Sequence, residues 1–166
     1  MVNYIQNITS LAGATSTLVR LVAFTGNLLN LNFDVGMNTN AIIGFPNTAG
    51  APNQNWFLVP QSANASQFTI QSAAFPSFFV SYATAAVGDA IEKHSQVVAS
   101  DSYATVFEME LVGSGPKVNL IDVASGYVLT SWDNADPVTW NDPTTPLTME
   151  NFNMPKSEMQ SFTIES

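Results

Sequence analysis

The sequence predicts an all-β fold built from three copies of one four-stranded unit, and three observations lead to this prediction. Short runs of β-branched and aromatic residues alternate with turns rich in Gly, Pro and Asn, which is typical of strands joined by tight turns. No segment keeps the 3.6-residue apolar period of an amphipathic helix. The third observation is a set of landmarks that recurs at nearly equal spacing, which is the signature of an internal repeat.

Two kinds of landmark repeat in the same register. Turns predicted at positions 26, 77 and 126 lie 51 and 49 residues apart, and each has a short apolar run on either side. An aromatic residue expected in the core opens the last strand of each unit: Trp56, Phe107 and Phe162. Three units of four strands match a β-trefoil, in which a closed barrel leaves no exposed sheet edge. A β-sandwich, the alternative, explains the strands but not the threefold register.

The chain is predicted to form one trefoil domain over 17–166, preceded by an extension over 1–16. In that extension, residues 4–8 could add a strand or mediate self-association as a homodimer. The predicted repeats are about 17–61, 62–115 and 116–166. Their third strands are expected at 41–45, 96–99 and 137–140. The segment 141–159 of the third repeat, which contains three prolines, is predicted to be a long loop.

Composition excludes several classes of partner. Four Lys/Arg face thirteen Asp/Glu, for a formal net charge of −9, which argues against nucleic acid and against anionic membranes. No apolar run is long enough for membrane insertion. The chain has no cysteine and no recognisable secretory signal, so we expect a disulfide-free cytoplasmic protein, or one released by an unconventional route. Because only 10% of residues are charged, the surface suits neutral polar ligands such as sugars.

The residues needed for catalysis or metal binding are scarce. His94 is the only histidine, whereas a zinc site needs several His or Cys ligands. His94 is expected to be an exposed loop residue. Glu108 and Glu110 alternate along one predicted strand and therefore point to the same face, which indicates a solvated surface rather than an acid–base pair. The sequence thus predicts no enzyme activity, no metal and no cofactor.

The first repeat carries a distinctive pattern. Gln54-x-Trp56 is preceded by Asn53, Phe45 stands eight positions before Asn53, and Asn30 stands fifteen before Phe45. This pattern resembles one repeat of the ricin-B-type β-trefoil lectins, and the chain looks most like the small cysteine-free lectins of mushrooms. The resemblance implies a non-catalytic lectin that binds galactose or N-acetylgalactosamine on glycoproteins or glycolipids, with a role in fungal defence.

The resemblance also implies roles for single residues. Phe45 would be the platform on which the sugar stacks, and Asn30 and Asn53 would bind its hydroxyls. Gln54 would support the loop from behind. Sugars present an apolar C–H face that an aromatic ring can cover, and amides both donate to and accept from hydroxyls. The Asn30 position usually holds Asp in the lectin family. Taken singly, each residue also fits an ordinary strand or turn role.

The other two repeats differ. The second has Ser81, Ala99/Ser100 and Thr105 at the matching positions, so it is predicted to be blank. The third offers a second candidate site in Asp133, Trp140 and Asn141, with Trp140 in the platform position. Two alternatives remain open. One is a fungal trefoil protease inhibitor that acts through the loops 141–159 or 87–95, and the other is a trefoil that has lost its sugar sites.

Overall fold

The computed structural model describes residues 2–7, 15–61, 64–89, 94–133, 144–152 and 157–166. Nearly all regular structure is β, as predicted. The strands are β1 (Thr17–Ala23), β2 (Leu28–Leu31), β3 (Ile42–Phe45), β4 (Trp56–Gln61), β5 (Asn64–Ser72), β6 (Phe79–Tyr82), β7 (Ser95–Ser100), β8 (Phe107–Leu111), β9 (Lys117–Asp122), β10 (Val128–Ser131), β11 (Leu147–Glu150) and β12 (Phe162–Glu165). The helical elements are α1 (Ala83–Ala86), η2 (Asn32–Asp34), η3 (Pro52–Gln54) and η4 (Ser157–Gln160). No helix in the described part of the chain is long and apolar enough to cross a bilayer.

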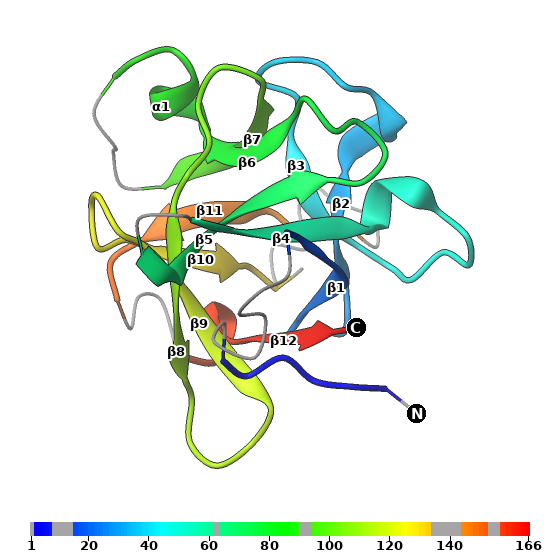
Figure 1. Cartoon of the computed structure of the whole chain (residues 1–166). Coiled ribbons are helices and arrows are strands. Elements are labelled where there is room, and N and C mark those ends of the chain that lie inside the picture. The colour runs from blue at the N-terminus through cyan, green and yellow to red at the C-terminus, as the bar shows by residue number, and fades with distance from the viewer. Residues whose placement is uncertain (1, 8–14, 62–63, 90–93, 134–143, 153–156) are drawn as a thin grey trace.

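Six of the strands close a barrel (Figure 1). Strand β1 pairs with β4, β4 with β5, β5 with β8, β8 with β9 and β9 with β12, and β12 returns to β1. All six pairings are antiparallel. Burial alternates along β1, where Val19, Leu21 and Ala23 are buried and the residues between them are not. This period of two places one face of each strand in the barrel interior.

The other six strands form three hairpins that cap the barrel: β2–β3, β6–β7 and β10–β11. Strand β11 also pairs with β7, and single bridges join Ala41 to Val98 and Gly44 to Thr145. Each hairpin therefore touches the other two. A six-stranded barrel capped by three mutually contacting hairpins is the predicted β-trefoil, which is confirmed. The turn positions Gly26 and Gly126 adopt left-handed φ angles of 86° and 75°, which glycine tolerates without strain.

The three aromatic landmarks occupy equivalent places in the core. Trp56, Phe107 and Phe162 are the first residues of β4, β8 and β12, and each is at most 1% exposed. They differ in one respect, because only Trp56 carries a polar group. Its indole Nε1–H donates to the Leu29 carbonyl of β2 at 3.0 Å. Trp56 thus ties the barrel of the first repeat to its own cap hairpin.

The third strand of the third repeat does not lie where it was predicted. It is β11, at Leu147–Glu150, inside the segment predicted to be a loop, in which η4 also begins. Residues 137–140 lie outside the described part of the chain. Fifteen residues separate β10 from β11, against ten between β2 and β3. This longer connection displaced the strand from the position that the repeat spacing predicts.

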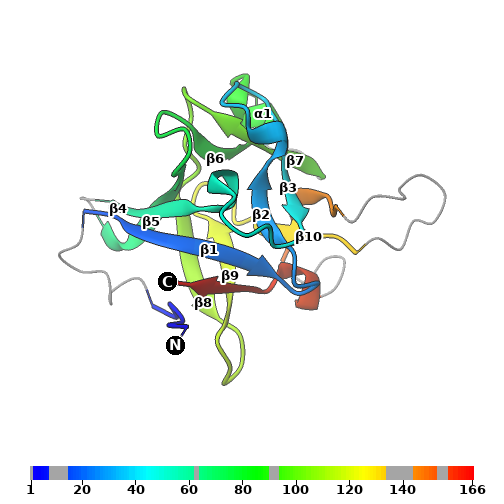
Figure 2. The same cartoon turned by 90° about the vertical axis from the view of Figure 1, so that its right-hand side faces the viewer.

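The N-terminal segment lies against the end of the chain. The Ile5 amide donates to the Ile164 carbonyl at 2.9 Å, and the Ser166 amide donates to the Asn3 carbonyl at 3.0 Å. The Ile5 side chain is buried in the core. Figures 1 and 2 accordingly place both termini on the same side of the molecule. The residues around Tyr4, which makes a single bridge to Glu165, extend the sheet beside β12.

Replacing Trp56 with alanine should destabilise the protein strongly. The change leaves a large cavity and removes the partner of the Leu29 carbonyl, so the free energy of unfolding should fall by about 3–5 kcal/mol. Urea denaturation measures this loss. Leu18→Ala, at a residue on β1 that is 51% exposed, is the control and should change stability by less than about 0.5 kcal/mol. Equal effects of the two changes would contradict the proposed core.

Candidate functional site

The cap hairpin of the first repeat carries a pocket of about 630 Å³. Three of the four residues predicted for the sugar site line it, namely Asn30 of β2, Phe45 at the end of β3 and Asn53 of η3. The 3-10 turn η3 packs beside β2 (Figure 2). Gln96 of the second repeat and Thr144 of the third complete the wall. The pocket therefore forms where the three repeats meet around the first hairpin.

The two asparagines share one acceptor. The Nδ2 groups of Asn30 and Asn53 both donate to the Leu31 carbonyl, at 3.2 Å and 2.9 Å. A side-chain amide has two N–H donors and a carbonyl that accepts. Each asparagine is thus held in place by one of its donors. Asn30 is buried and Asn53 is half-buried, and each also carries an Oδ1 and a second N–H as hydrogen-bonding groups. The pair can offer donors and acceptors together to a ligand hydroxyl.

Gln54 lies behind the pocket rather than in its wall. Its side chain is buried, its Nε2 donates to the Pro46 carbonyl at 2.9 Å, and its Oε1 accepts from the Thr48 amide at 3.0 Å. These two bonds clamp the 46–54 loop from within. The clamp positions Asn53, which immediately precedes Gln54 in the chain. This geometry is the one expected of a residue that supports the loop from behind.

Phe45 is placed by the packing of β3. Its ring is half-buried and lines the pocket together with Ile43, because alternate residues of a strand face the same side. The intervening Gly44 exchanges two backbone hydrogen bonds of 2.8 Å with Thr145 of the third repeat. A Cβ at Gly44 would clash with the Thr145 Oγ1, and glycine avoids this clash. The third repeat thereby fixes the strand that presents Phe45.

The pocket also contains residues that the sequence analysis missed. Phe33 and Asp34, in the turn η2 after β2, both line it. Phe33 is 85% exposed. The signal in the sequence was a large apolar residue between Asn32 and Asp34 in a segment of turn composition. Among the residues that the structure describes, no three His, Asp or Glu side chains gather in a way that could hold a metal ion.

The second repeat has no aromatic residue at the matching position. Phe45 lies opposite Leu28 in its hairpin, and Ser100 lies opposite Phe79 in the equivalent register. Ser100 is fully buried, and its Oγ accepts from the amides of Ser102 and Tyr103. Its hydroxyl therefore serves the turn after β7. That the second repeat binds no sugar stays a prediction.

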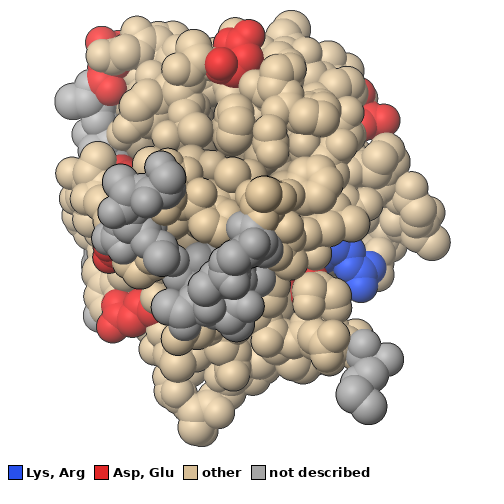
Figure 3. Space-filling model, viewed as in Figure 1, with Lys and Arg blue, Asp and Glu red and all other residues tan. Residues whose placement is uncertain are grey.

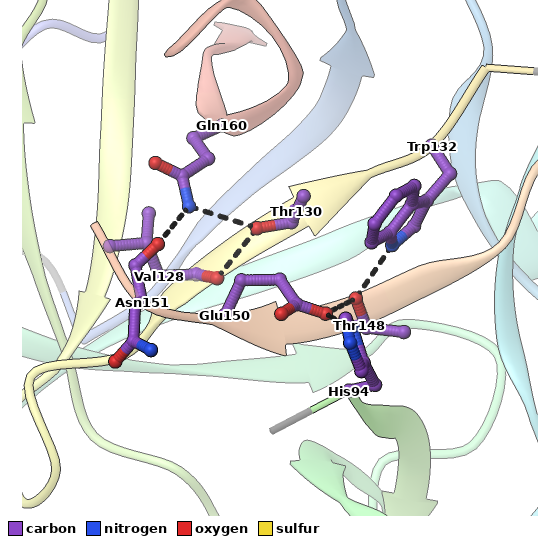
Figure 4. Close-up of polar contacts among 8 residues, drawn as sticks. All are labelled: His94, Val128, Thr130, Trp132, Thr148, Glu150, Asn151 and Gln160. Carbon is purple, nitrogen blue, oxygen red and sulfur yellow. Dashed lines mark hydrogen bonds and ion pairs between the residues drawn. The ribbon is translucent and has the colours of Figure 1, made fainter. Parts of the chain in front are cut away.

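In the third repeat a buried carboxylate holds the matching position (Figure 4). Glu150 lies opposite Val128 and is 1% exposed. Its Oε1 accepts from the Thr148 Oγ1 at 2.6 Å and from the His94 Nδ1 at 2.7 Å. The Thr148 hydroxyl in turn accepts from the Trp132 Nε1–H at 2.7 Å. A connected polar network thus stands where the first repeat has a phenyl ring.

Solved structures place this architecture among known proteins. A designed threefold-symmetric protein, ThreeFoil, is 14% identical with a TM-score of 0.72, and the match covers 90% of this chain and 98% of that one. The Rhizoctonia solani agglutinin is 20% identical with a TM-score of 0.71, over 91% and 96% of the two chains. The Macrolepiota procera ricin B-like lectin, solved with lactose, is 16% identical with a TM-score of 0.68, over 89% and 94%. The chain has the β-trefoil fold that it shares with these proteins. No protein-family model and no curated protein matches the sequence.

Within the trefoil, one expectation about the third repeat needs correction. The register gives the platform position to Glu150 and not to Trp140; Trp140 and Asn141 lie outside the described residues, so their part in a second site with Asp133 stays a prediction. His94 is an exposed turn residue, as expected, with a side chain that is 53% exposed. It also bonds to buried Glu150, and its ring lies 5.9 Å from that of Trp132. Sequence spacing does not predict this link between the second and third repeats.

Removing the Gln54 side-chain amide should loosen the 46–54 loop. In Gln54→Ala the Thr48 amide loses its acceptor, so its hydrogen exchange should accelerate at least tenfold, while stability falls by about 1–3 kcal/mol. Amide hydrogen exchange measured by NMR on Gln54→Ala and on a control variant, Gln160→Ala, tests this. Gln160→Ala is the matched control, because Gln160 of the third repeat is also buried and bonds to the Asn151 carbonyl at 2.7 Å. Loss of Thr48 protection in the control alone would refute the assignment.

Proposed function

We propose that the chain is a non-catalytic lectin that binds galactose or N-acetylgalactosamine units of glycans in the pocket of the first repeat. The observation that carries this proposal is the convergence of Asn30, Phe45 and Asn53 on one pocket. These residues come from three separate elements, and their chemistry is complementary. A half-buried phenyl ring stands beside two amides that are already oriented by a shared carbonyl.

This chemistry suits a galactose-type sugar. One side of that sugar is an apolar C–H face, which gains from contact with the Phe45 ring. Its neighbouring hydroxyls both donate and accept hydrogen bonds. The side-chain amides of Asn30 and Asn53 carry an acceptor oxygen and N–H donors, so they can pair with these hydroxyls in either direction. A volume of about 630 Å³ lies within the range usual for small-ligand sites. The groups that bind are thus pre-positioned before the ligand arrives.

The surface and the structural neighbours support the same class of ligand. On the face shown in Figure 3, most side chains are uncharged, acidic groups are scattered and basic groups are scarce. Such a surface offers little attraction to a polyanion. The Macrolepiota procera lectin, a neighbour in fold, was solved with lactose, a galactoside. Each sugar hydroxyl exchanges a bond to water for a bond to protein, so we expect weak single-site binding, with a Kd on the order of 0.1–1 mM.

Protease inhibition is less well supported by the geometry. The segment 141–159 is one of the two predicted inhibitory loops, but it contains β11 and the start of η4. Strand β11 pairs with both β10 and β7, so this part of the chain belongs to the cap. An inhibitor needs an exposed loop that a protease cleft can accept. The described part of 141–159 does not have that form.

Phe45→Ala should separate sugar binding from stability. Loss of one stacking contact worth about 1–1.5 kcal/mol should weaken affinity for methyl β-galactoside roughly tenfold. The ring is half-buried, so stability should fall by about 1 kcal/mol and not by the amount that a core aromatic would cost. Phe57→Ala is the control, because Phe57 is also half-buried but lies on β4, outside the pocket.

Titration calorimetry and thermal melts on the wild type and both variants supply the measurement. Phe57→Ala should keep the affinity of the wild type. Unchanged binding in Phe45→Ala would contradict the proposed site, and so would equal loss of binding in both variants.

A further inference from the structure

The turn between β2 and β3 holds an exposed aromatic ring in a strained conformation. Phe33 and Asp34 have φ angles of 55° and 51°, in the left-handed region that is costly for bulky residues. Phe33 is 85% exposed, the highest value among the exposed large hydrophobic residues described. Its ring therefore adds little to the core. Neither a favourable backbone conformation nor burial of the ring in the core accounts for a phenylalanine at this position.

The turn is held rigidly in place. The Asn40 Nδ2 donates to the carbonyls of Asn32 and Val35, at 2.8 Å and 2.7 Å, and so bridges the two ends of the turn. The following residues are fastened to the second repeat, where the Ala99 amide donates to the Asn40 carbonyl at 2.8 Å. A strained conformation persists only where its surroundings enforce it. The fold thus presents the Phe33 ring in one orientation before any ligand binds.

Phe33 and Phe45 line the same pocket from opposite ends of the hairpin. Phe45 lies opposite Leu28, at the start of β2, whereas Phe33 follows Leu31, at its end. Three extended residue steps, about 10 Å along the backbone, separate Leu28, the partner of Phe45, from Leu31, which stands two residues before Phe33. That distance exceeds the length of one pyranose ring. A single sugar on Phe45 would leave Phe33 uncovered.

We propose that the pocket takes a neutral oligosaccharide of at least two units, with the galactose-type unit on Phe45 and the neighbouring unit stacked on Phe33. This inference rests on the proposed function and adds its ligand length. The Asp34 carboxylate, which also lines the pocket, is a strong acceptor for a hydroxyl of the second unit. The same carboxylate disfavours an anionic sugar there, as does the net charge of −9.

Binding of three neutral probes tests the ligand length: methyl β-galactoside, lactose and α-1,3-galactobiose. The two disaccharides extend galactose on different sides. At least one of them should bind the wild type roughly two- to tenfold more tightly than the monosaccharide, which is the gain expected of one added stacking contact. Phe33→Ala should abolish this gain and should weaken monosaccharide binding much less than Phe45→Ala does. Phe45→Ala should weaken the binding of all three.

A second variant separates a ligand-binding role from a structural one. Glycine accepts the left-handed φ at position 33 without strain, so Phe33→Gly should melt at the same temperature as the wild type or higher, while it also loses the gain for the disaccharide. A lower melting temperature would indicate that the ring is structural and would overturn the inference. Monosaccharide binding with no gain for either disaccharide would overturn the inference alone. No binding of any probe by the wild type would overturn the proposed function as well.

Discussion

The site depends on one contact between the barrel and its cap, the hydrogen bond from the Trp56 indole to the Leu29 carbonyl. The Trp56 ring is buried in the core, and its N–H reaches into β2 one residue before Asn30. Gln54 and Asn53 stand two and three residues before Trp56 in the chain. One buried side chain thus fixes the spacing between the two amides of the pocket. An unpaired N–H in that core would be costly, so this bond also sets the register of the hairpin on the barrel.

The threefold fold supports three different chemistries at one equivalent position. The register places Phe45, Ser100 and Glu150 at matching points of the three hairpins. A phenyl ring can stack on an apolar face, a buried hydroxyl serves a local turn, and a buried carboxylate demands donors of its own. In the third repeat those donors are Thr148 and His94. The scaffold is shared, and the side chain at this one position decides what each repeat can do.

Most of the fold could be predicted because it depends on local signals that repeat. Turn residues and the buried aromatics Trp56, Phe107 and Phe162 follow simple rules of spacing and burial. The strand β11 could not be placed in this way, because a longer connection precedes it and Trp140 offered an aromatic residue near the expected spacing. Prediction failed where the third repeat departs from the length of the other two.

The candidate site could likewise be predicted only in part from the sequence. Asn30, Phe45 and Asn53 could be identified because their spacing resembles a known repeat, and the fold brings them to one pocket. Phe33 and His94 could not, since their positions depend on contacts between repeats. Phe33 is held by a turn that Asn40 braces against the second repeat, and His94 reaches Glu150 across 56 residues of sequence. Such contacts leave no periodic trace in a single sequence.

The most direct test of a single sugar site in the first repeat is an NMR titration of the isotope-labelled wild type with lactose. Lactose contains the proposed galactose unit and can be raised well above the expected Kd of about 1 mM or less. We expect the largest shifts on the backbone and side-chain amides of Asn30 and Asn53 and on the backbone amide of Phe45. Largest shifts at Thr148 and Glu150, or no shifts at saturating lactose, would contradict this expectation.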